Sequence, residues 1–126
     1  MAECTTSATD AAIDACTRVI EGRRVSRDIL VMAYANRAAT YFQRGDNARA
    51  LTDLDAAIRL DPRNHEAIAL RAQVFARQGN FDRAIADQSA TISLRVDPSA
   101  ALRERGALNQ RKGDAAAALA DFNAAI

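Results

Sequence analysis

The sequence has no tryptophan, only two prolines and few aromatic residues, which make up 5% of its 126 positions. So few prolines leave long stretches free to form helices, because proline removes a backbone donor and clashes with the preceding helical turn. Hydrophobic residues still account for 49% of the chain, and many of them are alanine. Alanine favours helices and lets their backbones approach closely. The composition therefore predicts one domain of closely packed helices.

The chain also has almost no net charge and few histidine and cysteine residues. The formal net charge is only +1, which argues against a nucleic-acid partner, because such a surface needs a clear surplus of Lys and Arg. No apolar run reaches the roughly 18–20 residues of a membrane span. The single histidine, His65, is far from both cysteines and from every serine. We therefore expect no metal site, no cofactor and no enzyme activity.

The two cysteines, Cys4 and Cys16, both lie near the N-terminus. Two arrangements are open: reduced thiols with Cys16 buried in a helix interface, or a disulfide that ties the N-terminal arm to the first helix. A disulfide would favour an oxidising compartment such as a periplasm. No signal peptide is recognisable, so a cytoplasmic protein is expected if Met1 is the native start, and an exported one if a signal peptide was removed.

A 34-residue repeat runs through the chain. Three glycines stand 34 residues apart, and other residues keep the same interval. The recurring residues are Gly45, Gly79 and Gly113; Arg37, Arg71 and Arg105; Ala50, Ala84 and Ala118; Asp53, Asp87 and Asp121; and Ile58, Ile92 and Ile126. Within each unit apolar residues recur at three- and four-residue steps, which is a helical period. Each unit is therefore predicted to be a helix, a short turn and a second helix.

The repeated glycine marks the turn between the two helices. Glycine can take the positive φ that ends the first helix. The next residue, which is Asp46, Asn80 or Asp114, can cap the second helix with its side chain. The tripeptide Arg-Gly-Asp at residues 44–46 is thus one of three versions of the same turn, and we do not interpret it as an adhesion signal.

The repeat resembles the tetratricopeptide repeat (TPR), a 34-residue helix–turn–helix unit. The family's pattern positions are filled by Tyr34, Ala38, Tyr41, Ala50, Leu54 and Pro62 in the first unit, by Ile68, Ala72, Phe75 and Ala84 in the second, and by Leu102, Gly106, Ala118 and Phe122 in the third. Arg37, Arg71 and Arg105 replace the usual leucine, and Gln88 stands where an aromatic residue or leucine is expected. The resemblance implies an all-α fold: a right-handed α-solenoid of about seven helices in antiparallel pairs.

The predicted domain organisation follows the repeat. It consists of an N-terminal arm (1–9), a lone capping helix and linker (10–30), and three TPR-like units (31–64, 65–98 and 99–126), of which the last has a shortened second helix. The lone helix is expected because residues 10–21 align without gaps with the second helix of the second unit, which places Cys16 on the packed face. This leader resembles those of exported bacterial repeat proteins. We expect the second helix of the second unit to run about two residues further than its counterpart in the first unit. The first helix of the third unit should then begin with Asp97 as its N-cap and Pro98 at its first helical position.

The repeated arginines lie beside the core face of the first helix in each unit, and the repeated aspartates beside that of the second. We predict an ion pair between the two helices in every unit. A structural role is favoured, because catalytic groups rarely recur identically in each repeat. Such pairs specify how helices align more than they add stability.

The resemblance also implies a function, which is protein–protein interaction as a scaffold or adaptor. A peptide or partner protein would bind the concave face that the first helices line. The family's groove positions correspond to Asn36, Phe42, Gln43, Gln73, Arg77, Arg103, Gln110 and Arg111, with neighbours that include Glu104 and Ala107. Amides and arginines suit an extended peptide. The alternative is a self-assembly module that forms a homo-oligomer through the exposed C-terminal helix with Leu119, Phe122 and Ile126.

Overall fold

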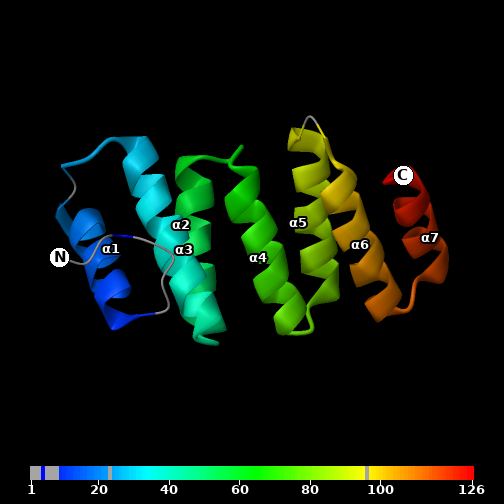
Figure 1. The fold of residues 1–126 in the computed structure, drawn as a ribbon, viewed down its shortest axis with the longest axis horizontal. Coiled ribbons are helices and arrows are strands. Elements are labelled where there is room, and N and C mark those ends of the chain that lie inside the picture. Colours follow the sequence, from blue (N-terminus) through cyan, green and yellow to red (C-terminus); the bar gives the residue numbers. More distant parts are fainter. Residues whose placement is uncertain (1–3, 5–8, 23, 96) are drawn as a thin grey trace. The chain divides into compact units, whose positions relative to one another are not determined.

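The computed structural model describes residues 4, 9–22, 24–95 and 97–126, and all regular structure in these residues is α-helical (Figure 1). The helices are α1 (Asp10–Gly22), α2 (Arg27–Gln43), α3 (Asn47–Leu60), α4 (His65–Arg77), α5 (Phe81–Leu94), α6 (Ser99–Lys112) and α7 (Ala115–Ala124). The predicted all-α fold of seven helices is confirmed. None of the helices among these residues is long and apolar enough to cross a membrane.

The chain divides into two compact units, residues 1–67 and residues 68–126. In the first unit α1 packs on α2, and α2 packs on α3. In the second unit α5 packs on α6, and α6 packs on α7. Successive helices within each unit run in opposite directions (Figure 1). Because the turns between them are short, neighbours in sequence are also neighbours in space.

The first helix of the first repeat begins at Arg27. Ser26 is the N-cap of α2, and its side chain accepts a hydrogen bond from the backbone N–H of Ile29 at 3.3 Å. The helix therefore starts four residues before the predicted unit boundary at residue 31. This start agrees with the preference of serine for the N-cap position. The boundaries of the repeat units themselves stay a prediction.

The turn between the two helices has the same conformation in all three repeats. Gly45, Gly79 and Gly113 have φ angles of 80°, 78° and 101°, a region in which a side chain would be strained. The following residue caps the next helix: the side chain of Asp46 accepts from Arg49 N–H at 3.2 Å. Asn80 and Asp114 make the equivalent bonds to Arg83 and Ala117. Arg-Gly-Asp in the first repeat is therefore part of a helix-to-helix turn.

The junction before the third repeat differs from the prediction. Helix α5 ends at Leu94 and is as long as α3, at 14 residues, so the expected extension is wrong. Arg95 is already extended, with φ −101° and ψ 146°, and a residue before proline, such as Asp97, is also biased away from the helical region. Pro98, and not Asp97, is the N-cap of α6. Hydrogen bonds from the side chain and backbone of Ser99 lower the pKa of Asp97.

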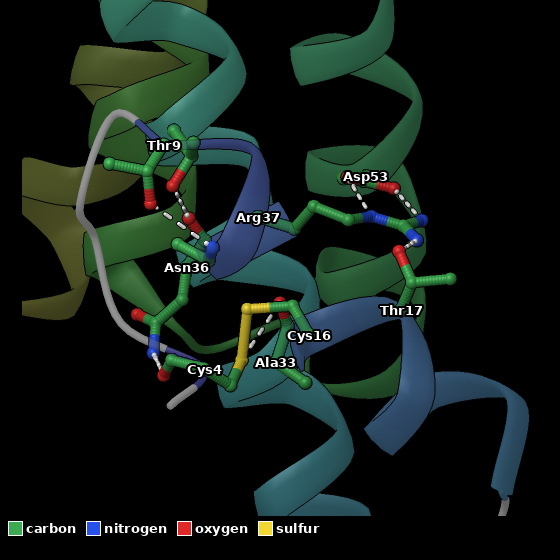
Figure 2. Close-up of a disulfide and its surroundings, with 10 residues drawn as sticks. Cys4, Thr9, Cys16, Thr17, Ala33, Asn36, Arg37 and Asp53 are labelled. Carbon is green, nitrogen blue, oxygen red and sulfur yellow. Dashed lines mark hydrogen bonds and ion pairs between the residues drawn. A yellow bond between two sulfur atoms is a disulfide. The ribbon is translucent and has the colours of Figure 1, made fainter. Parts of the chain in front are cut away.

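In each repeat, a bidentate ion pair between an arginine and an aspartate joins the two helices. Nε and Nη2 of Arg37 donate to the two carboxylate oxygens of Asp53 at 2.7 and 2.6 Å (Figure 2). The pairs Arg71–Asp87 and Arg105–Asp121 repeat this geometry at 2.6–2.9 Å. The hydrogen bond to Asp53 raises the pKa of Arg37. Since a planar fork meets a planar carboxylate in one orientation, each pair fixes the rotation of one helix against the next.

The N-terminal arm is tied to the first unit by a disulfide between Cys4 and Cys16 (Figure 2). Cys16 is fully buried on α1. The backbone carbonyl of Cys4 accepts a hydrogen bond from Nδ2 of Asn36 at 2.9 Å, and its Sγ atom lies 4.0 Å from the carbonyl oxygen of Ala33. Of the two arrangements that the sequence leaves open, the structure has the disulfide, and it brings Cys4 against the face of α2.

Candidate binding groove

A groove of about 200 Å³ opens in the second unit between α4 and α6. Its lining is Ala72, Gln73 and Ala76 of α4, Gln88 of α5, and Glu104, Ala107, Leu108 and Arg111 of α6. The four residues of α6 follow the spacing i, i+3, i+4, i+7, which places them on one face of a helix. The small alanine side chains on both walls leave the space open, and Leu108 belongs to the buried cluster beneath it.

The floor beneath the groove is a compact apolar cluster. Buried Ala72, Ala76, Ala84 and Leu108 form its centre, and Phe75, Phe81 and Ile85 pack against it. This cluster joins α4, α5 and α6, so the two walls of the groove are held on one packed support. A groove supported in this way is largely formed before a ligand arrives.

Polar groups stand at defined places along the groove. Nε2 of Gln88 donates to Oε2 of Glu104 at 2.6 Å. The guanidinium of Arg111 lies over the ring of Phe81, 4.9 Å from the ring centroid, in a cation–π contact. Beside it, Lys112 pairs with Asp82 at 2.5 Å, and this hydrogen bond raises the pKa of Lys112. The groove therefore carries a carboxylate and a guanidinium in addition to its apolar floor.

The residues predicted to contact a partner are distributed over both units. Gln73 and Arg111 line the groove. Arg77, Arg103 and Gln110 are exposed on α4 and α6 but lie outside its lining. In the first unit Gln43 is exposed and Phe42 is half-buried, while the amide of Asn36 is bonded to Cys4. The groove also contains Gln88, which the sequence marks only as a departure from the repeat pattern.

Exposed apolar side chains lie on the C-terminal helix α7 and directly after it. Leu119 is 61% exposed and Ile126 is fully exposed. Phe122 is half-buried, because its ring packs on Gly106 of α6, where an added Cβ would lie 2.9 Å from the ring. Of the three residues predicted at an oligomer interface, Phe122 is thus engaged within the chain. Among the described residues no group of three or more Asp, Glu, His or Cys side chains could hold a metal ion.

Residues 38–79, a third of the chain, match the family model of the TPR repeat. This segment of the chain therefore resembles the TPR repeat. TPR repeats are generally non-catalytic protein-interaction modules. A search of curated protein sequences finds no significant match.

Solved TPR structures share the fold. A crystal structure of MamA matches 92% of this chain with a TM-score of 0.83 and 23% identity, and a second MamA crystal structure matches 90% with a TM-score of 0.81 and 24% identity. TTC0263, a thermophilic TPR protein of Thermus thermophilus, matches 92% with a TM-score of 0.73 and 20% identity. The chain spans 66%, 60% and 63% of these three chains, respectively, which is less than two thirds. At these identities the likeness shows the fold.

Proposed function

We propose that this protein is a TPR-like scaffold or adaptor that binds a partner protein through an extended peptide segment lying between α4 and α6. The observation that supports the proposal is the groove of about 200 Å³, with an apolar floor and fixed polar groups on its walls. Peptide-binding sites combine these features, because apolar floors take side chains and polar walls take the peptide backbone and charges.

Reversing the charge of Arg111 should weaken peptide binding about tenfold or more, because an acidic group of the ligand would lose its partner and meet a like charge. The test selects peptides from a combinatorial library on the full chain and compares their affinity for wild type and Arg111→Glu by calorimetry. Arg95→Glu is the matched control, because it makes the same change at an exposed position of the second unit outside the groove lining. A library that yields no binder, or binders indifferent to Arg111→Glu, would contradict the proposed function.

Self-assembly through α7 is a second candidate function, and the exposure of Leu119 and Ile126 favours it. If α7 is the interface, the mass measured by light scattering should rise above that of one chain as concentration increases. Leu119→Glu should then return the protein to the single-chain mass, since it places a charge in the interface. A single-chain mass of the wild type at high concentration would exclude this candidate.

A further inference from the structure

Gln88 is polar at a position that is apolar in the other repeats. In the 34-residue register, Leu54 and Phe122 occupy the same place. Gln88 is only 1% exposed and Leu54 is 0% exposed, so both are core positions. An amide at such a place destabilises the folded state unless its donor and its acceptor are both satisfied.

The amide of Gln88 is satisfied on one side only. Nε2 donates to Glu104, and this contact sets the orientation of the amide, because a carboxylate can only accept. Oε1 is turned away from Glu104, is buried, and has no hydrogen-bond partner among the described residues. Gln88 belongs to the groove lining, but its Oε1 atom is shielded from solvent, so a ligand N–H reaches it only when the side chains around it move apart.

Two residues of opposite charge line the groove on α6. Glu104 and Arg111 are seven residues apart, which is two turns or about 10 Å along the helix axis. The ring of Phe81 supports one face of the Arg111 guanidinium, and the N–H groups at its edge can still bind a carboxylate. Glu104 is exposed and keeps lone pairs for a second donor.

We propose that the groove binds an extended peptide that places a basic side chain at Glu104, an acidic side chain at Arg111, and one backbone N–H on Oε1 of Gln88. This inference rests on the proposed function and adds the chemistry of the ligand. An extended chain in the polyproline II conformation rises about 3.1 Å per residue and has three residues per turn, so two charged residues three positions apart lie on one face and span about 10 Å. A cavity of about 150 Å³ admits benzene, and the groove of about 200 Å³ therefore has room for one apolar side chain between them.

The experiment titrates the isotope-labelled full chain with defined peptides and follows binding by NMR. The probe is Gly-Lys-Ala-Val-Asp-Gly with both ends blocked, and its neutral control has Gln and Asn in place of Lys and Asp. A third set carries one N-methyl group at each backbone nitrogen in turn. We expect the charged peptide to bind about tenfold more tightly than the neutral one. Methylation at one position should weaken binding about three- to tenfold, because one neutral hydrogen bond is lost.

Gln88→Leu separates the ligand-binding role from a structural one. It should raise Tm by about 3–10 °C, because the unsatisfied acceptor is removed. The substitution should also weaken binding of the charged peptide about three- to tenfold. N-methylation of the peptide should then weaken its binding to this variant no further. Gln78→Leu, at an exposed position just after α4 and outside the groove lining, is the matched control and should leave peptide affinity unchanged.

The inference is overturned if no probe binds, if Gln88→Leu binds like wild type, or if methylation weakens both proteins equally. A lower Tm for both Gln88→Leu and Gln88→Met would contradict the unsatisfied acceptor on which it rests. A library-selected peptide that depends on Arg111 but is indifferent to Gln88 would overturn this inference and leave the proposed function standing.

Discussion

Replacing Asp53 with alanine should lower the free energy of unfolding of the first unit by about 3 kcal/mol. The carboxylate is almost buried, with 4% of its side chain exposed, and Arg37 is only 17% exposed. The variant keeps the guanidinium, which stays charged, and removes the partner of two of its donors. The third contact of Arg37, from Nη1 to Thr17 Oγ1 at 3.0 Å, is to a neutral hydroxyl and cannot balance the charge.

Urea unfolding measured by tyrosine fluorescence tests this expectation on the first unit alone. The chain has no tryptophan, and both tyrosines, Tyr34 and Tyr41, lie on α2. Thr52→Ala, at an exposed position of α3, is the control and should change stability by less than about 0.5 kcal/mol. A loss below about 1 kcal/mol for Asp53→Ala would show that the pair contributes no more than a surface ion pair.

Replacing both members of the pair with leucine should restore most of the lost stability. Apolar residues of similar volume often match or exceed a buried ion pair, because neither charge then has to be desolvated. We expect the double variant Arg37→Leu/Asp53→Leu to unfold within about 1 kcal/mol of wild type. If it is as unstable as Asp53→Ala, the loss comes from packing and not from the stranded charge.

Reduction of the Cys4–Cys16 disulfide should destabilise the first unit by about 2–3 kcal/mol. The bridge closes a loop with a sequence separation of 12, and a loop of about 15 residues is worth about 3 kcal/mol in the chain-entropy model. Urea unfolding with and without a phosphine reductant measures the difference, again through the tyrosines of α2.

The control for this measurement is Cys4→Ala. This variant should be as unstable as the reduced wild type and should not respond to the reductant. Equal urea midpoints for oxidised and reduced wild type would show that the bridge does not stabilise the fold. The hydrogen bond between Asn36 and the Cys4 carbonyl is tested separately by Asn36→Ala, so that loss of the arm contact is not mistaken for loss of the bridge.

Most of the fold can be predicted from the sequence, because each repeat contains the residues that determine its turn and its two helices. Glycine at the turn, the capping side chain after it and the helical spacing of apolar residues recur three times, so a signal that is weak in one unit is strong in the set. The partners of the ion pairs could also be predicted, since Arg37 and Asp53 keep their spacing in every unit. The junction at Pro98 differs from the prediction, because α5 ends at Leu94 and Arg95 is already extended.

The candidate site is less predictable from sequence. Family positions indicate which residues lie near a groove, but the groove depends on which neighbours are small enough to leave it open, and that follows from packing. Whether the buried amide of Gln88 finds a partner is a three-dimensional question as well. Asn36 shows the same limit, because its predicted ligand-binding amide is bonded to Cys4, which lies 32 residues earlier in the chain.

The three arginine–aspartate pairs have a consequence for trimming and rebuilding the protein. Each arginine finds its aspartate 16 residues later, so every pair closes within one repeat. A deletion that ends inside one of these intervals removes the aspartate and leaves its arginine without that partner. A cut between α3 and α4, or between α5 and α6, keeps both members of every pair in the same fragment. The second cut also gives up the contact from Arg105 to the Ser89 hydroxyl, the hydrogen bond from Gln88 to Glu104 and the exposed ion pair between Lys112 and Asp82. Whole repeats can therefore be removed, duplicated or exchanged without separating any of the three arginines from its aspartate.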